Sequence, residues 1–192
     1  MKATIISFKI FLFFTLLTGI IYPLFITGIA QVVFHTQANG SLILEENRKI
    51  GSKLIGQQFD STIYFTSRPS AISYNPLPSG GSNFGLTNAR LKNLVTERRN
   101  WFIGFNQLDS LAEIPSEMLF ASGSGLDPHI SPKAALLQID RIAKARNFNF
   151  TQKQNLAETV KKLTETPQFL VLGEERVNVL ILNLELNKLE KK

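Results

Sequence analysis

The chain begins with a long apolar run that contains no charged residue. Residues 10–34 are rich in Phe, Ile and Leu and contain no Asp, Glu, Lys or Arg. About 20 such residues span the hydrocarbon core of a bilayer, so this pattern predicts one transmembrane helix. A cleaved signal peptide is the alternative, because Gly28 and Ala30 are spaced as in a small-x-small cleavage site. The run is longer than the roughly 7–15 apolar residues of a signal peptide, which favours a retained anchor.

Small and helix-perturbing residues recur every four positions within this run, at Thr15, Gly19, Pro23 and Thr27. Residues at this spacing share one side of a helix, where small side chains let a second membrane helix approach closely. The pattern predicts a seam for packing against a partner helix, with a kink at Pro23. The general abundance of Gly and Pro in membrane helices is the alternative explanation.

The charges beside the run predict its orientation. Lys2 and Lys9 precede it, whereas residues 35–44 contain neither Lys nor Arg. The positive-inside rule then places residues 1–9 in the cytoplasm, residues 10–34 in the inner (plasma) membrane and residues 35–192 outside the cytoplasm. Basic residues at positions 48, 49 and 53 reduce this asymmetry. They do not reverse it, because large domains translocate largely regardless of such charges.

The pattern after the apolar run alternates between short extended segments and amphipathic helices. Residues 50–65 combine β-branched and aromatic residues with glycines, which predicts short strands and turns. A helix is expected after Asn88, ending at residues 97–99, and residues 101–113 are expected to form a connector. A second helix is expected after Pro132, with one apolar face made of Ala135, Leu136, Ile139, Ile142 and Ala143.

The last third of the chain predicts two more helices. Thr151 and Gln154 have the spacing of a capping box that opens a helix, and Pro167 lies after its end. Residues 169–172 fit a short strand. Residues 177–189 fit a strand or a helix, and Asn178 as an N-cap favours the helix. The expected fold is therefore α+β: one transmembrane helix followed by a single mixed α/β domain outside the cytoplasm.

A loop of unusual composition precedes the second helix. Residues 122–132 contain two glycines and two prolines, which excludes a continuous helix or a central strand. Its candidate functional residues are Ser122, Gly123, Ser124, Gly125, Asp127, His129 and Ser131. A rigid loop that caps the helix at Ser131 is the main interpretation, and a docking surface for a partner is the second. Asp127 precedes Pro128, and its carboxylate is expected to accept backbone N–H bonds within the loop or near the helix N-terminus. A Ser-His-Asp triad is disfavoured, because its members normally converge from separate parts of a fold.

A second loop, rich in glycine, lies upstream of the first expected helix in this part of the chain and comprises Ser79, Gly80, Gly81, Ser82 and Asn83. Backbone N–H groups of such a loop can hold an anion. The Walker A pattern G-x-x-x-x-G-K-[ST] is absent from the sequence. A structural loop is therefore the main interpretation, and a site for an anion or a partner is the alternative.

Composition narrows the functional classes. The chain has no Cys and only two His residues, which excludes disulfides and makes a metal site unexpected. Its formal charge is +6, but Lys and Arg are scattered and no nucleic-acid-binding motif is present. The sequence contains no converging set of catalytic residues, so we expect neither catalytic residues nor nucleic acid as a partner.

Several motifs, in order along the chain, resemble the C subunit of the Kdp-type high-affinity potassium-transporting ATPase, the KdpC family. They lie at residues 51–59, 64–75, 79–88, 121–146 and 177–183. Leu86, where the family pattern has Pro, and Phe120, where it has a small polar residue, depart from it. The resemblance covers the anchor and nearly all of the remaining chain.

The resemblance implies a non-catalytic accessory subunit of an ATP-driven potassium import complex. The partners would be a channel-like potassium-translocating subunit and an ATP-hydrolysing subunit. The complex would handle ATP and potassium, and no cofactor is expected on this chain. The resemblance also implies that this chain raises the ATP affinity of the catalytic subunit in a chaperone-like way. A membrane-anchored periplasmic binding protein or enzyme that acts alone is the alternative.

Overall fold

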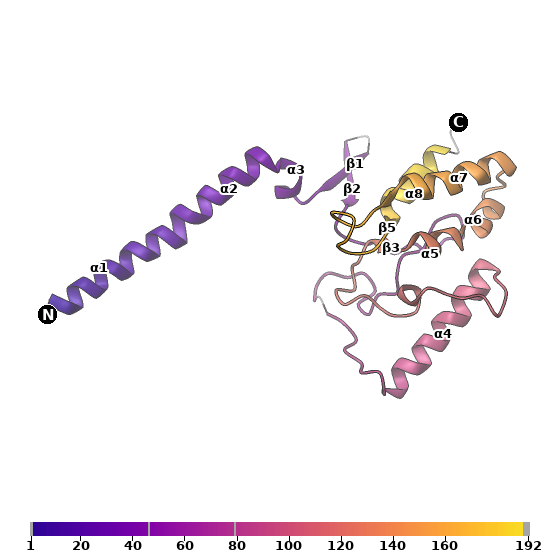
Figure 1. Cartoon of the computed structure of the whole chain (residues 1–192), viewed down its shortest axis with the longest axis horizontal. Helices are drawn as coiled ribbons and strands as arrows, with labels where there is room; N and C mark the ends of the chain where they lie inside the picture. Colours follow the sequence, from indigo (N-terminus) through magenta and orange to yellow (C-terminus); the bar gives the residue numbers. More distant parts are fainter. Residues whose placement is uncertain (1, 46, 79, 190–192) are drawn as a thin grey trace. The chain divides into compact units, whose positions relative to one another are not determined.

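The computed structural model describes residues 2–45, 47–78 and 80–189 (Figure 1). It divides into two compact units, Met1–Ser52 and Lys53–Lys192, which are considered separately. The prediction of a mixed helix and sheet fold behind one N-terminal apolar helix is confirmed.

The first unit consists mainly of one long helix. The segments α1 (Lys2–Leu16), η1 (Leu17–Ile21) and α2 (Tyr22–Val33) run continuously through 32 residues. This helix is long and apolar enough to cross a membrane, and none of its most apolar window is buried within the protein. Phe34 leaves helical geometry, with φ of −126°.

The helix widens to a π-helical turn just before its proline. The N–H of Tyr22 donates to the carbonyl oxygen of Leu17, five residues back. Proline has no N–H for a helical bond and its ring crowds the preceding turn, and a π turn is one way to accommodate both defects. Gly19 lies within η1, and Pro23 lies in the first turn of α2.

A short helix and a hairpin complete the first unit. The helix α3 (His35–Ala38) precedes the strands β1 (Leu42–Glu45) and β2 (Arg48–Ser52). The strands pair antiparallel with a bulge between Ile43 and Leu44. The hydroxyl of Ser52 donates to the carbonyl oxygen of Gly40 at 2.7 Å. Strand structure in the range 50–65 is therefore confined to its first residues.

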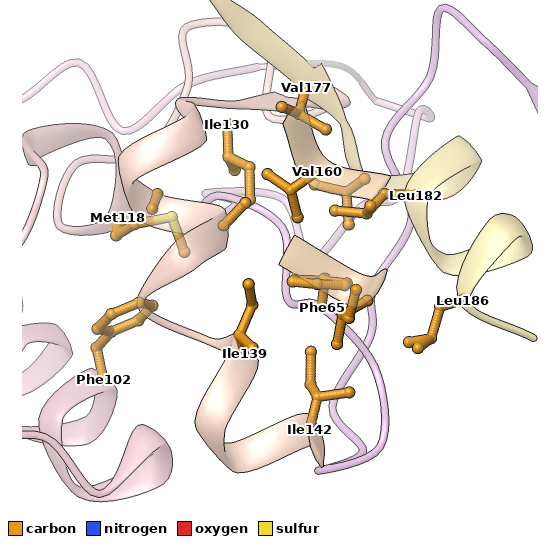
Figure 2. Packing of buried hydrophobic residues seen from close by; sticks show 14 of the residues in the cluster. Phe65, Phe102, Met118, Ile130, Ile139, Ile142, Val160, Val177, Leu182 and Leu186 are labelled. Atoms are coloured by element: carbon orange, nitrogen blue, oxygen red, sulfur yellow. The ribbon is translucent and has the colours of Figure 1, made fainter. Parts of the chain in front are cut away.

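The second unit packs helices around a small antiparallel sheet. Its helices are α4 (Ala89–Asn106), η2 (Ser116–Met118), α5 (Pro132–Leu136), α6 (Ile139–Ala145), α7 (Phe150–Lys162) and α8 (Val179–Leu189). Its strands β3 (His129–Ile130), β5 (Arg176–Asn178) and β4 (Thr164–Glu165) lie in that order across the sheet. Figure 2 shows the core between them, which includes Phe65, Phe102, Met118, Ile130, Ile139, Ile142, Val160, Val177, Leu182 and Leu186.

The helix after Asn88 is longer than predicted. Asn88 caps it by accepting a hydrogen bond from the Arg90 N–H at 2.8 Å. The helix continues through residues 97–99 and much of the predicted connector, and ends where Gln107 adopts a left-handed conformation. The charged triplet that suggested an end instead lies on the helix, where the Arg98 side chain donates to the Leu119 carbonyl oxygen at 2.9 Å.

The helix predicted after Pro132 is confirmed at its start but is interrupted. Ser131 caps it, and Pro132 lies in its first turn. Leu137 and Gln138 separate α5 from α6, and Gln138 is fully buried. Leu136, predicted to lie on the apolar face, is 42% exposed, whereas Ala135, Ile139, Ile142 and Ala143 are buried.

The next predictions differ in their details. The capping box of α7 is formed by Asn149 and Gln152, two positions before the predicted pair, because both reciprocal hydrogen bonds occur there. The strand predicted at residues 169–172 is wrong, and these residues form an exposed turn. The helix favoured for residues 177–189 is confirmed as α8, after a short strand, and the Asn178 side chain accepts from the Ile181 N–H at 3.2 Å.

Buried polar side chains attach the segment 61–66 to the helices. Arg141 donates to the carbonyl oxygens of Ser61 and Thr62, and Gln138 accepts from the Thr66 N–H at 2.8 Å. Asn183 of α8 accepts from the Phe65 N–H at 2.8 Å and donates to its carbonyl oxygen at 3.0 Å. These bonds satisfy backbone groups of a turn-containing segment that belongs to no strand in the described part of the chain.

Candidate functional site

The loop of residues 122–131, hereafter the central loop, is joined to the fold at its end by strand pairing. His129 pairs with Asn178 and Ile130 with Val177 across β3 and β5. The Val179 N–H donates to the Pro128 carbonyl oxygen at 2.9 Å. The central loop therefore enters α5 from a strand position fixed by the sheet.

Ser131 connects the end of the central loop to α5 and to η2. Its hydroxyl accepts from the Ala134 N–H at 3.1 Å, as expected of an N-cap. Its own N–H donates to the Glu117 carboxylate at 3.2 Å. The predicted role of Ser131 as a cap is confirmed.

Asp127 is the electrostatic centre of the central loop. Its Oδ1 accepts from the His129 N–H at 3.0 Å, and its Oδ2 accepts from Arg68 Nη1 at 2.6 Å. His129 Nδ1 lies 3.4 Å from Oδ1. Burial alone would raise the pKa of this carboxyl group, but hydrogen bonds from His129 and Arg68 outweigh burial and lower the pKa to about 2. The expected hydrogen bond to a backbone N–H is confirmed, and the ion pair was not foreseen.

The glycines of this region are required by close backbone packing. Gly125 has φ of +69°, and a Cβ there would lie 2.5 Å from Cγ1 of Ile72. The Gly56 N–H donates to the Leu126 carbonyl oxygen at 2.7 Å. A Cβ on Gly56 would lie 2.7 Å from the Asp127 carbonyl oxygen. The central loop therefore lies directly against the backbone at Gly56 and against the side chain of Ile72.

The two loops found in the sequence meet in space. A Cβ on Gly81 would lie 3.1 Å from the carbonyl oxygen of Gly123. Ser82 and Asn83 are exposed, and Gly80 is half-buried. Ser79, also predicted as a site residue, lies outside the described residues.

The remaining residues of the central loop have structural contacts. Ser122 is buried, and its N–H donates to the Pro69 carbonyl oxygen at 3.3 Å. The Ser124 hydroxyl accepts from the Leu126 N–H at 3.1 Å. A Ser-His-Asp triad would need a hydrogen bond from Ser124 to His129, with Asp127 as the third member. Within the described part of the chain no such bond joins Ser124 to His129, so these residues do not form a triad relay. The described residues also contain no cluster of three or more His, Asp or Glu side chains that could hold a metal ion.

Residues 68–74 hold the central loop in place, a role that the sequence did not predict. Ser70 donates its hydroxyl to the Gly125 carbonyl oxygen at 2.7 Å. The Tyr74 hydroxyl donates to the carbonyl oxygen of Arg68, and burial raises the pKa of Tyr74 to about 12. Arg68, before Pro69 in a turn-rich passage, was the available signal, because its charged side chain has no evident partner in the neighbouring sequence.

A cleft of about 400 Å³ borders the ion pair. Arg68, Asp127 and His129 line one part of it, and residues 166–168 and 172–176 line another. A separate pocket of about 250 Å³ has Arg98, Trp101 and Tyr74 in its wall. Both spaces carry mixed charge and polar groups, and the larger one is suited to contact with a polar or charged surface.

Asp127→Ala is expected to lower the free energy of unfolding by about 2–3 kcal/mol at neutral pH, because it removes a turn-forming acceptor and leaves Arg68 unpaired. The folded-state pKa of Asp127 lies below its ordinary value of 3.8. The Asp127 carboxylate therefore contributes about 1–2 kcal/mol to the free energy of unfolding through its charge, after a reduction for partial exposure. This contribution is complete at pH values above the ordinary pKa and is lost as the pH falls toward 2.

Thermal unfolding of the full chain in mild detergent, from pH 7 to pH 3, measures this difference. Asp109→Ala is the matched control, because Asp109 accepts a similar turn bond from the Leu111 N–H at 2.7 Å but is exposed and has no arginine partner among the described residues. Equal melting temperatures for Asp127→Ala and the original chain at pH 7 would contradict the role assigned to this carboxylate.

Comparison with known proteins identifies the relatives of this chain. The family model described as KdpC, the c chain of the K⁺-transporting ATPase, matches residues 4–188. A potassium-transporting ATPase KdpC subunit from Pectobacterium atrosepticum is 46% identical over 185 residues, 95% of this chain and 94% of the relative.

Relatives from distant bacteria agree. The KdpC subunit from Geotalea uraniireducens is 46% identical over 94% of this chain and 95% of its own length. The corresponding protein from Bacillus cereus is 45% identical over 93% of this chain and 91% of its own length. The similarity includes the apolar helix, the central loop and α8, so the chain belongs to the KdpC family.

Proposed function

We propose that this chain is a non-catalytic accessory subunit of an ATP-driven, high-affinity potassium import complex. The observation that carries the proposal is the match to the KdpC family over residues 4–188. The relatives, named as subunits of potassium-transporting ATPases, are similar over nearly their whole length. The match therefore extends over the apolar helix and nearly all of the second unit of this chain.

The partners in this proposal are a potassium-translocating, channel-like subunit, an ATP-hydrolysing subunit and the lipid bilayer. The apolar helix supplies one contact, and the second unit supplies another. Binding through the helix makes the second contact effectively intramolecular, which strengthens weak contacts by orders of magnitude. The small residues Thr15, Gly19, Pro23 and Thr27 are proposed to face a partner helix, and the π-helical turn at Gly19 lies within this stretch.

The accessory role is supported by the chemistry of the central loop. Asp127 is held as a carboxylate by Arg68 and His129, and its low pKa makes it a weak base. The Ser124 hydroxyl accepts a backbone N–H and has no base bonded to it within the described residues. We therefore assign ATP hydrolysis and potassium translocation to the other subunits.

An effect on the ATP affinity of the catalytic subunit belongs to this proposal in an indirect form. ATP is cytoplasmic, whereas the flanking charges predict that residues 35–192 lie on the other side of the membrane. Direct contact with nucleotide is incompatible with that topology. The coupling would travel through membrane helices, and each site would have to bind one state of the complex better than another.

The proposed topology predicts that protease added outside intact spheroplasts digests the chain beyond Phe34. An epitope at the N-terminus should survive until the membrane is permeabilised. The reason is the charge difference between Lys2 and Lys9 on one side and residues 35–44 on the other. Protection of the second unit in intact spheroplasts would reverse the orientation.

The proposed function predicts co-purification. An affinity-tagged full chain, isolated from its own bacterial membranes in mild detergent, should bring two larger proteins with it. The eluate should hydrolyse ATP faster with potassium than without. A tagged chain that elutes alone, or that hydrolyses a substrate by itself, would contradict the assignment.

A further inference from the structure

The turn between β4 and β5 exposes four consecutive apolar side chains. The exposed fractions are 86% for Phe169, 82% for Leu170, 78% for Val171 and 60% for Leu172. We call residues 169–172 the apolar tip. Isolated exposed apolar residues are ordinary on a protein surface, whereas a contiguous group commonly marks a site of interaction.

The apolar tip has a defined conformation. Gln168 and Leu172 form a bridge in which each N–H donates to the other carbonyl oxygen at 2.9 Å. The Leu170 N–H donates to the Pro167 carbonyl oxygen at 3.1 Å, and the Val171 N–H donates to that of Gln168 at 3.2 Å. These bonds hold the side chains outward before any partner binds, which lowers the entropy lost on docking.

The conformation has an energetic cost that folding alone does not explain. Phe169 and Leu170 have φ of 52° and 65°, a left-handed geometry in which Gly or Asn is usual. A bulky residue there costs about 1–2 kcal/mol, and the side chains gain no burial in return. Selection for stability would place small or polar residues at both positions, so these side chains have another use.

We propose that the apolar tip docks into an apolar groove, rimmed by basic side chains, on another subunit of the potassium import complex. This inference rests on the proposed function, which supplies the other subunits. A four-residue tip is small for an independent interface. It is sufficient as an anchoring contact on a chain that its transmembrane helix already keeps beside its partners.

The charges beside the tip favour a protein groove over the bilayer surface. Glu174 and Glu175 follow it after Gly173, are exposed and form no ion pair within the described residues. The next residue, Arg176, is paired with Glu165 at 2.9 Å, so the net charge beside the tip is negative. Segments that insert at lipid surfaces combine apolar tips with Lys or Arg, which anionic headgroups attract. Here the adjacent charges are acidic, so headgroups would repel them and basic groove residues would attract them.

The tip also borders the central loop. Leu172, Glu174 and Glu175 line the 400 Å³ cleft together with Arg68 and Asp127. A partner segment that covers the tip would therefore reach the ion pair. This arrangement gives the central loop, which the sequence suggested as a docking surface, a place at the edge of the same interface.

Cysteine labelling tests the proposal, because the chain contains no native cysteine. Leu170→Cys is placed in the full chain, and the rate of reaction with a water-soluble maleimide is measured on this chain after electrophoresis. Leu111→Cys is the control, because Leu111 is 89% exposed in another loop. We expect Leu170→Cys in the purified complex to react at least about tenfold more slowly than in the isolated chain, the protection given by an anchoring contact, with Leu111→Cys unchanged.

Each other outcome overturns the docking proposal. Protection of Leu170→Cys in nanodiscs that hold this chain alone would assign the tip to lipid, and protection that rises with chain concentration would assign it to a second copy. Equal rates in the complex and the isolated chain would leave the tip uncovered. If the chain never co-purifies with larger subunits, the proposed function itself fails, which is a separate result.

Leu170→Gly separates docking from folding. Glycine adopts positive φ without strain, so the melting temperature of the full chain in detergent should stay equal or rise. Yield of the intact complex should fall several-fold, because the anchoring side chain is gone. A lower melting temperature would show that Leu170 stabilises the fold, and an undiminished yield would show that it does not anchor the chain in the complex. Either result would overturn the proposal.

Discussion

Arg141→Ala is expected to lower the free energy of unfolding of the second unit by about 3–5 kcal/mol. The guanidinium group donates to Asn106 at 2.9 Å, to Gln138 at 3.0 Å and to the carbonyl oxygens of Ser61 and Thr62. Alanine leaves the buried Asn106 Oδ1 and the Thr62 carbonyl oxygen without this donor, whereas Gln138 keeps its bonds from Thr66. It also removes the cation–π contact with Phe105, at 4.5 Å from the ring centroid. Each unsatisfied buried group costs about 1–3 kcal/mol.

The cost is a large part of the about 5–15 kcal/mol that stabilises an ordinary domain. Burial lowers the pKa of Arg141 to about 10, which remains well above neutral pH, so the side chain stays charged and continues to donate. Chemical denaturation of the full chain in mild detergent, followed by the fluorescence of Trp101, measures the change.

Lys144→Ala is the matched control for this variant. Lys144 lies on the same helix and donates to Gln107 at 2.9 Å, but it is exposed. Its loss should change the free energy of unfolding by no more than about 0.5 kcal/mol. If Arg141→Ala were as mild as the control, the buried polar network would not hold the segment 61–66.

The sequence predicted elements whose signals are local. The apolar run predicted the N-terminal helix, Ser131 and Pro132 predicted the start of α5, and Asn178 predicted the start of α8. Each depends on hydrophobicity or on hydrogen bonds within one turn of chain. Such signals are readable without knowledge of the tertiary fold.

Errors arose where distant residues decide the structure. Gln138 interrupts the expected helix because its side chain bonds to Thr66, 72 positions away. The turn at residues 169–172 has the composition of a strand, but β5 pairs instead with residues 164–165 and 129–130. No local pattern contains this information.

The candidate site was predicted to a similar extent. Asp127 was identified from its place before Pro128, because an Asp in that setting accepts backbone hydrogen bonds. Its partner Arg68 lies 59 positions away, and long-range ion pairs have no spacing rule. The contact between Gly81 and Gly123 likewise required the fold.

Omission of this chain is expected to abolish potassium-stimulated ATP hydrolysis by the detergent-solubilised complex. A subunit promotes transport only if it binds the competent assembly better than the separated parts. Here the apolar helix and the second unit would supply two linked contacts. A chain lacking residues 1–34 loses the tether, so the concentration that it needs to act should be higher by about 100-fold or more.

The central claim is therefore tested by potassium-stimulated ATP hydrolysis, measured with the other subunits alone, with the full chain added back, and with the chain lacking residues 1–34. Thermal unfolding of the shortened chain serves as the control for its folding. With each form of the chain added at the same concentration, equimolar with the other subunits, the account predicts stimulated hydrolysis only with the full chain. Undiminished stimulation without this chain, or hydrolysis of ATP by the purified chain alone, would contradict it.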